Sequence, residues 1–273
     1  MTADDAQRGR RKPNFVLVLC DDLGYGDVEP YGGTIPTPTI NRMASEGLVA
    51  TDFYAPANLC SPSRAGFLSG RYPIRSGLGY EVIFQGEDRV FPLSEPTIPR
   101  ALGPEYTSAL FGKWHLGHAG PTWLPTNYGF DRFFGIPYSH DMLPLTVFDA
   151  NAGGAVHERE PEFSELQQQF YAQAERFIEA NRDRPFFVQL ALSAPHLPEY
   201  PTKEFRGTSN AGPYGDVIRE IDDIVGRLLL KLRQLNLQRD TFVFFTSDNG
   251  PWFEGSSSPL RDRKGAAGYD GGY

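Results

Sequence analysis

NFVLVLC, residues 14 to 20, is an apolar run that begins on an asparagine and is followed by two aspartates, Asp21 and Asp22. Its apolar residues do not alternate with polar ones, which is typical of a parallel strand buried on both faces of a sheet. Three later runs have the same character: YTSALF (106–111), PFFVQLAL (185–192) and TFVFFT (241–246). The sequence therefore predicts four buried parallel strands.

Helical periodicity fills the segments between the last three runs. Apolar residues share one helical face at Leu166, Phe170, Ala174, Phe177 and Ile178, and again at Val217, Ile218, Ile221, Ile224, Val225 and Leu228. This alternation predicts an α/β fold with a doubly wound, mostly parallel sheet sandwiched between helices. Segments rich in Pro and Gly predict long loops at 24–38, 92–104, 112–137 and the end of the chain.

Polar side chains follow every predicted strand. Ligands of such sheets bind beyond the carboxyl ends of the strands, so these side chains are expected to converge there. They are Asp21 and Asp22 after the first strand, Lys113 and His115 after the second, His196 after the third, and Asp248 and Asn249 after the fourth.

The oxygens of Asp21, Asp22, Asp248 and Asn249 are the hard ligands that Ca²⁺ or Mg²⁺ prefers. Asp21 and Asp22 alone could equally cap a helix or lie in a solvated turn. A second acidic pair at the equivalent place on another strand favours a metal site.

The segment LCSPSRAGFLSGR, residues 59 to 71, places Cys60 at the start of a predicted helix that Pro62 can initiate and Arg64 flanks. A helix N-terminus beside an arginine attracts anions. These residues alone allow two interpretations of Cys60, a nucleophile of lowered pKa or a small buried side chain near a helix cap.

CSPSRAGFLSGR resembles the sulfatase signature, CxPSR followed by GR at the proper interval. PNFVLVLCDDLGYGD, GKWHLG, APH and TSDNG resemble the strand, lysine, histidine and second metal segments of that family, and GIPYSHD resembles its arylsulfatase A branch. The similarity extends from about Pro13 to Tyr273. It implies the sulfatase-like fold of the alkaline phosphatase superfamily and hydrolysis of sulfate esters.

The resemblance implies that Cys60 is oxidised to formylglycine by a formylglycine-generating enzyme. The hydrated aldehyde would attack sulfur, and its second hydroxyl would lose a proton to release sulfate. Asp21, Asp22, Asp248, Asn249 and the modified Cys60 would hold Ca²⁺, with Mg²⁺ less favoured.

Further roles follow from the resemblance. Arg64 would orient the hydrated aldehyde, His115 would accept the proton that drives sulfate release, and His196 would act at the leaving oxygen. Lys113, Lys264 and Ser139 would contact the sulfate group. The non-catalytic alternatives are that the lysines are solvated surface charges, that the histidines are structural, and that Arg64 only caps a helix or pairs with an aspartate.

Four other residues are expected to have less direct roles. His118 and His157 are interpreted as loop histidines, and His140, beside Ser139, as a candidate to line the pocket. Cys20, which ends an apolar run and is not followed by PSR, is interpreted as a core residue.

The net charge of -8 and the pI near 5.2 argue against a nucleic-acid partner, since phosphates require a basic field. Two cysteines make neither a disulfide framework nor a zinc site. No secretory signal and no apolar stretch of roughly 20 residues is visible, so no membrane partner is expected. As written the protein is predicted to be cytoplasmic, or periplasmic or secreted if a native N-terminus precedes it. The sequence makes no prediction of oligomeric state.

We expect a flexible segment at 1–12 and a catalytic domain at 13–273 that lacks the small C-terminal domain of other sulfatases. Since that domain contributes to the substrate pocket, weak activity is expected of the isolated chain. Two other functions stay open: a phosphonate monoester or phosphodiester hydrolase of the same superfamily, and a catalytically silent sulfatase-like binding protein. GIPYSHD favours the sulfatase.

Overall fold

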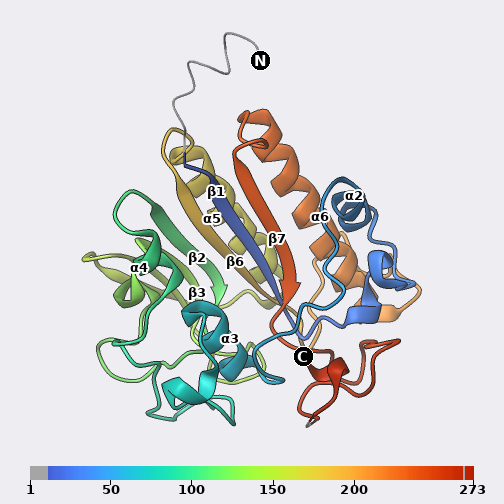
Figure 1. The fold of residues 1–273 in the computed structure, drawn as a ribbon, viewed down its shortest axis with the longest axis horizontal. Helices are drawn as coiled ribbons and strands as arrows, with labels where there is room; N and C mark the ends of the chain where they lie inside the picture. Colours follow the sequence, from blue (N-terminus) through green and yellow to red (C-terminus); the bar gives the residue numbers. More distant parts are fainter. Residues whose placement is uncertain (1–11, 267) are drawn as a thin grey trace.

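A computed structural model describes residues 12–266 and 268–273, and its ribbon is shown in Figure 1. Apart from Lys12, the segment expected to be flexible therefore lies outside the described residues. One sheet runs through the chain in the order β5-β4-β3-β2-β6-β1-β7. The strands are β1 (Asn14–Asp21), β2 (Thr107–Lys113), β3 (Arg132–Ile136), β4 (Val147–Asn151), β5 (Val156–Arg159), β6 (Phe186–Pro195) and β7 (Thr241–Ser247).

The sheet is mostly parallel, which confirms the predicted fold class. β1 lies between β6 and β7, and β2 lies between β6 and β3, all in parallel pairs. The four predicted strands are β1, β2, β6 and β7, and each continues beyond its predicted carboxyl end. β4 and β5 are antiparallel additions at one edge that the sequence did not predict.

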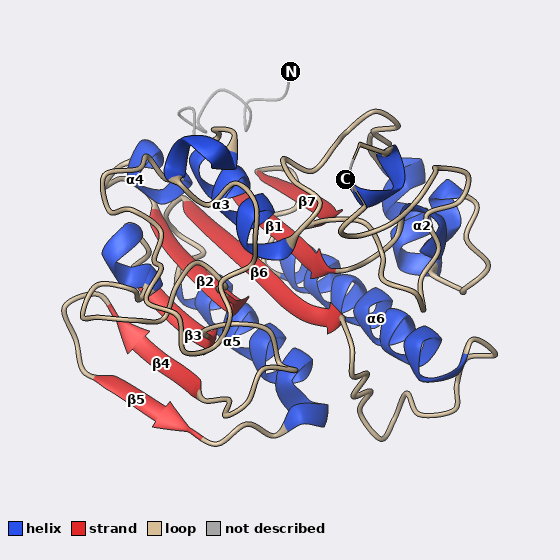
Figure 2. Ribbon diagram, turned by 90° about the horizontal axis from the view of Figure 1, so that it is seen from below, coloured by secondary structure: helices blue, strands red, loops and turns tan. Residues whose placement is uncertain are grey.

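Helices cover both faces of the sheet, as Figure 2 shows from below. α5 (Leu166–Ala180) and α6 (Gly212–Gln234) lie on one face, with α2 (Pro38–Glu46) packed on α6. α3 (Cys60–Ser69) and α4 (Ile98–Leu102) lie on the other face. The two layers make this a doubly wound sheet.

Side chains of β1 alternate between two apolar cores. Val16 and Val18 pack in the core shared with α5 and α6, whereas Leu17 and Leu19 pack in the core shared with α3. Because both faces of this strand are buried, every position of its central part can be apolar, which explains the continuous run.

Two expectations about burial and loops were wrong. β7 is not fully buried, since Phe242 and Phe244 are 57% and 52% exposed, because β7 is an edge strand with one face open among the described residues. The segment 112–137, expected to be a loop, contains β3, whose ladder with β2 overrides the local Gly and Pro signal.

Candidate active site

The carboxyl ends of β1 and β7 meet, as the sequence predicted. Asp21 is the last residue of β1, and Asp22 turns the chain away with a φ of 65°. The backbone N–H of Asp248 donates to the carbonyl of Cys20 at 3.0 Å, and the N–H of Asp22 donates to Asp248 Oδ1 at 3.2 Å. These bonds hold the three carboxylates in one buried group.

Helix α3 brings Cys60 to this group. The Ser63 hydroxyl donates to the backbone carbonyl of Asp248, and Arg64 Nε and Nη2 lie 2.9 and 2.8 Å from Asp248 Oδ2. Cys60 is the first residue of the helix, and its Sγ lies 3.4 Å from Asp21 Oδ1 and 3.9 Å from Asp22 Oδ1. The thiol therefore faces both aspartates from the N-terminus of α3.

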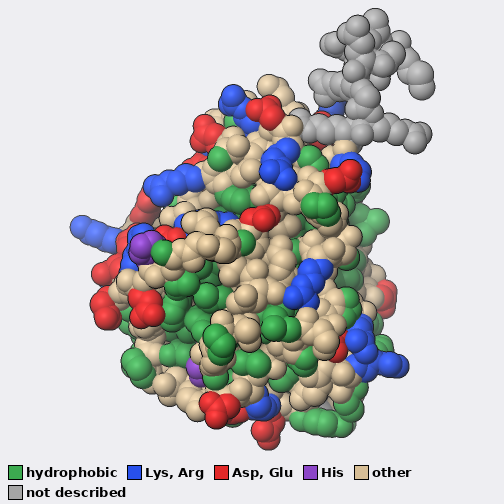
Figure 3. All heavy atoms as spheres, turned by 90° about the vertical axis from the view of Figure 1, so that its left-hand side faces the viewer, with side chains coloured by type: hydrophobic (Ala, Val, Ile, Leu, Met, Phe, Trp, Pro, Cys, Tyr) green, Lys and Arg blue, Asp and Glu red, His purple; other side chains and the backbone are tan. Residues whose placement is uncertain are grey.

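Two lysines from distant parts of the chain neutralise these aspartates. Lys113, at the end of β2 and fully buried, places its Nζ 2.6 Å from Asp21 Oδ2. Lys264 Nζ lies 2.7 and 2.8 Å from the two carboxylate oxygens of Asp22. With Arg64, three cations face three carboxylates in a protein whose net charge is -8. On the surface shown in Figure 3, by contrast, acidic and basic side chains are interspersed.

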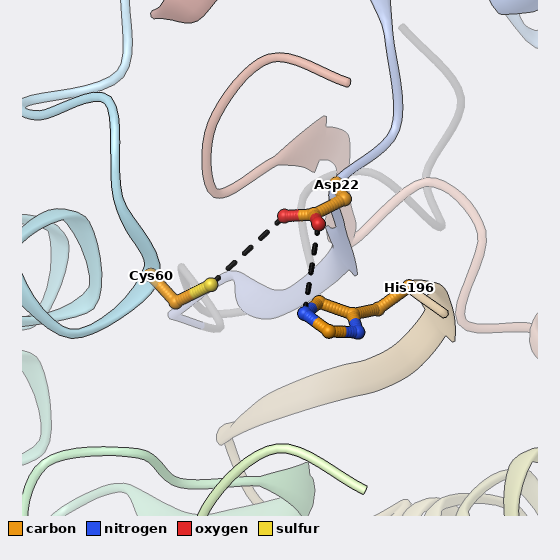
Figure 4. Close-up of side chains that lie close together, drawn as sticks. All are labelled: Asp22, Cys60 and His196. Carbon is orange, nitrogen blue, oxygen red and sulfur yellow. Dashed lines mark hydrogen bonds and ion pairs between the residues drawn. The ribbon is translucent and has the colours of Figure 1, made fainter. Parts of the chain in front are cut away.

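His196 follows β6, and its ring lies beside Cys60, with one ligand atom each of Asp22, Cys60 and His196 within 4.8 Å of the others. Its Nε2 lies 3.6 Å from Asp22 Oδ2, and Figure 4 shows Asp22 between Cys60 and His196. Its Nδ1 lies 2.6 Å from the carbonyl of Leu197, which requires a proton on Nδ1. The ring is therefore fixed with Nε2 directed at the site.

His115 lies beside Lys113 and Arg64 with a φ of 57°. Its Nε2 is 3.1 Å from the carbonyl of Ile83 and must donate to it, so Nδ1 carries the lone pair. Nδ1 is buried and has no hydrogen-bond partner among the described residues. Burial, Lys113 and Arg64 hold the pKa of His115 well below its ordinary value.

Burial and neighbouring charges also set the pKa values of Asp21 and Cys60. Burial raises the pKa of Asp21, but Lys113, His196, Arg64 and Lys264 together hold it well below its ordinary value. Burial raises the pKa of the Cys60 thiol far above its usual range, although Lys113 and Lys264 oppose the shift. Asp21 is thus a carboxylate and Cys60 a protonated thiol at neutral pH.

The donor set fits a hard divalent cation. One ligand atom each from Asp21, Asp22, Cys60 and Asp248 lies within 4.8 Å of all the others, and the four residues are buried. Asn249 Nδ2 donates to Asp22 Oδ1 at 2.8 Å, while its Oδ1 is buried without a partner among the described residues. Carboxylate and amide oxygens suit Ca²⁺ or Mg²⁺, whereas an unmodified thiol does not.

Ser139 directly precedes His140, whose ring contacts that of His196 rather than the carboxylates. The Ser139 hydroxyl is buried and has no partner among the described residues. His140 donates Nε2–H to the carbonyl of Pro198 at 3.0 Å, and its ring centroid lies 5.7 Å from that of His196. Both histidines line a small pocket with Tyr200. The structure therefore places the ring of His140 in contact with that of His196.

The remaining candidates lie outside the site. His118 lies in a loop, as predicted, and its Nε2 accepts a hydrogen bond from the backbone N–H of Gly86. The loop prediction for His157 was wrong, because this residue is exposed on strand β5, which pairs with β4. Cys20 is fully buried in the core at the end of β1, as predicted.

Two groups that organise the site were missed. Ser63, which binds the backbone of Asp248, stands inside the quoted PSR motif and could have been singled out. Asp27 stands inside DDLGYGD, but its partner Tyr214 lies on α6, and no local pattern connects the two.

The sulfatase family matches residues 13–273. Human arylsulfatase A is 39% identical over 293 residues, which cover 96% of this chain and 57% of that protein. Human N-acetylgalactosamine-6-sulfatase is 41% identical over 262 residues, which cover 87% of this chain and 50% of that protein.

A solved structure, the PsFucS1 sulfatase from Pseudoalteromonas sp., matches with a TM-score of 0.88 and 32% identity, covering 98% of this chain and 61% of that one. The chain spans about half the length of the curated relatives it matches. The matched segment contains every strand of the sheet and every residue of the buried charged group. This chain belongs to the sulfatase family.

Proposed function

We propose that this chain hydrolyses sulfate esters in the manner of an arylsulfatase, with a formylglycine derived from Cys60 as the nucleophile. The observation that carries the proposal is the position of Cys60 Sγ, within 4 Å of Asp21 and Asp22 and surrounded by Lys113, Lys264 and His196. The two relatives above are both named as sulfatases, one for aryl sulfates and one for 6-sulfated N-acetylgalactosamine. A sulfate ester is what those names share.

The residues that would hold the cation are Asp21, Asp22, Asp248, Asn249 and the modified Cys60. When bound, a calcium ion, or less favourably Mg²⁺, would lower the cost of forming an oxyanion beside it. The surrounding residues already restrict where that charge can develop. Arg64 pairs with Asp248, and its Nη1 donates to the carbonyl of Lys113, so the guanidinium is locked beside the nucleophile.

The proposal includes modification of Cys60 because burial favours the protonated thiol over the thiolate. Burial raises its pKa far above neutral, so the thiolate that would react is scarce. A formylglycine supplies an aldehyde whose hydrate carries the attacking hydroxyl. We therefore propose a formylglycine-generating enzyme as the partner that matures the chain.

Lys113 and Lys264 are proposed to bind the sulfate group, and His115 and His196 to transfer protons. The lysine ammonium groups lie where sulfate oxygens can replace their aspartate partners, which stabilises the charge of the reacting group. His196 directs Nε2 at the site because Nδ1–H is bound to the carbonyl of Leu197, and in its doubly protonated form the ring would give the Nε2 proton to the leaving oxygen. His115 presents a free Nδ1 that can accept a proton. Ser139, with its unpartnered hydroxyl, is proposed to contact the sulfate group.

Two measurements test the proposal. The protein is produced with a formylglycine-generating enzyme, and the peptide containing Cys60 is weighed to detect conversion of the CH₂SH group to CHO. Turnover of nitrophenyl sulfate and of a nitrophenyl phosphonate ester is then compared, with calcium and with a chelator. We expect conversion, calcium-dependent sulfate turnover and slower phosphonate turnover. An unconverted cysteine, or faster phosphonate turnover, would contradict the proposal.

A further inference from the structure

Asp27 joins three segments of the chain below the proposed active site. Its buried carboxylate accepts hydrogen bonds from the backbone N–H of Gly24 at 2.7 Å, the hydroxyl of Tyr214 at 2.6 Å and the backbone N–H of Ser256 at 2.8 Å. Gly24 belongs to the loop that follows Asp21 and Asp22, and Tyr214 to α6. Ser256 belongs to residues 250–266, named here the Lys264 loop. One side chain thus ties the first aspartate loop to the Lys264 loop.

The two loops approach so closely that side chains are excluded between them. The N–H of Gly26 donates to the carbonyl of Ser256 at 2.7 Å. A Cβ added at Gly24 would lie 2.3 Å from that same carbonyl oxygen, and one at Gly255 would lie 2.3 Å from the Tyr214 hydroxyl. Glycine is therefore needed at both positions for Asp27 to make its contacts.

The far end of the Lys264 loop is fixed as well. The N–H of Lys264 donates to the carbonyl of Pro251 at 3.0 Å, and that of Gly265 donates to the carbonyl of Asn58 at 3.0 Å. Asn58 Nδ2 also donates to the carbonyl of Ala266 at 2.8 Å. The backbone that bears Lys264 is thus held at Ser256 by Asp27 and at residues 265–266 by the segment before Cys60.

We propose that Asp27 is a positioning residue that holds the Lys264 ammonium against Asp22, where a sulfate group would bind. The inference rests on the proposed function. A lysine side chain is long and flexible, so its head is held at a defined point only if its backbone is fixed. The hydrogen bonds of Asp27 go to Gly24, Tyr214 and Ser256 rather than to the crevice side chains, so it acts through Lys264.

Asp222 provides a matched control. It is also a buried carboxylate that accepts two backbone N–H groups, those of Thr39 at 3.1 Å and Ile40 at 2.8 Å. It stands on α6 and fixes α2 instead of the Lys264 loop. Asp27→Asn and Asp222→Asn each place an amide nitrogen where an oxygen accepted backbone hydrogens. Both variants should lose stability, and only the first should disturb Lys264.

The test is a double-mutant cycle on the full chain with matured Cys60. Asp27→Asn should lower kcat/KM for nitrophenyl sulfate about tenfold, the usual size for loss of a supporting hydrogen bond behind a site. In a Lys264→Ala background the same substitution should have almost no further effect, because the group it positions is gone. Tyr214→Phe, which removes one hydrogen bond, should act in the same direction with a smaller change. An equal Asp27→Asn effect in both backgrounds would overturn the inference.

A second readout needs no turnover. Acetylation of lysines by a succinimidyl ester, followed by mass spectrometry, reports how often each ammonium group leaves its partner. Asp27→Asn should raise the labelling rate of Lys264 severalfold relative to Lys113, which serves as the internal measure of global unfolding. Asp222→Asn should leave that ratio unchanged. If the wild type neither turns over nor binds inorganic sulfate, the proposed function fails, whereas an unchanged Lys264 ratio in Asp27→Asn defeats the positioning role alone.

Discussion

The buried polar groups at the two ends of strand β1 differ in whether their hydrogen bonds are satisfied. At the amino end, Asn14 is fully buried, donates to Thr241 Oγ1 at 3.1 Å and accepts from the N–H of Phe186 at 3.3 Å. At the carboxyl end, Asp21 and Asp22 pair with Lys113 and Lys264. Nearby buried atoms such as Asn249 Oδ1 have no hydrogen-bond partner within the described part of the chain.

The difference separates a structural polar residue from a functional group. A buried polar atom without a partner costs free energy, so a fold built only for stability satisfies it, as β1 does at Asn14. Unpartnered atoms gathered at the other end of the same strand indicate groups reserved for a ligand.

Replacement of Cys60 by Ala should give the largest effect. Because it removes the proposed nucleophile, turnover of nitrophenyl sulfate should fall by at least about a thousandfold, while thermal unfolding changes little. Cys20→Ala is the matched control, since Cys20 is the other buried cysteine and packs in the core. Loss of turnover in Cys20→Ala at full stability would contradict the division between the two thiols.

Lys113→Met should cause the largest loss of stability. It leaves a buried carboxylate at Asp21 without its closest cation, and breaking such a pair costs about 3–5 kcal/mol. The measurement is urea unfolding of the metal-free protein. Lys12→Met breaks the exposed pair with Glu105 and should cost about 1 kcal/mol or less. Equal losses of unfolding free energy would show that the buried Lys113–Asp21 pair stabilises the fold no more than the exposed Lys12–Glu105 pair.

Acid should lower the free energy of unfolding through His140, which contacts His196 near the carboxyl end of β1. Asn14, at the amino end, does not titrate. Burial, with a smaller contribution from His196, lowers the pKa of His140 to about 4. In the unfolded chain a histidine titrates near about 6.5. The folded state therefore binds fewer protons between these values. The stabilising contribution is complete above about pH 6.5 and is lost as the pH falls toward about 4.

This contribution amounts to about 3 kcal/mol at most, since each unit of pKa shift corresponds to about 1.4 kcal/mol. His140→Gln should flatten the pH dependence of the unfolding free energy over that range. His157→Gln, which changes an exposed histidine on β5, should leave it unaltered. If the unfolding free energy of His140→Gln depends on pH as steeply as that of the wild type, His140 does not cause the acid sensitivity.

Asn14→Ala should have the smallest effect. It leaves the N–H of Phe186 and the Thr241 hydroxyl without this partner, which costs about 1–2 kcal/mol. Turnover per folded molecule should stay at the wild-type level, because the site lies at the opposite end of the strand. A drop in kcat at unchanged stability would break the comparison between the two ends.

The sequence predicted the central sheet because the strands that carry the site are apolar on both faces. The continuous apolar run from Phe15 to Cys20 is typical of a strand buried on both faces. β4 and β5 escaped prediction because both are short, and VHER of the edge strand β5 is exposed at every position, so no apolar pattern marks it.

The convergence at the strand ends was also predictable, since Asp21 and Asp248 end neighbouring parallel strands. Which groups pair was not. The bonds from Lys264 to Asp22 and from Tyr214 to Asp27 span 242 and 187 positions, and they depend on loops whose course no local rule sets.

The position of β1 between β6 and β7 has a consequence during synthesis. The strand that is made first cannot be flanked until Thr241 and the residues after it have been added, which takes about 10 to 45 s at translation rates of roughly 5–20 residues per second. Throughout that interval the segment around Cys60 has no completed sheet on which to pack. If Cys60 is modified as proposed, the modifying enzyme would act on the nascent chain, before folding buries the thiol.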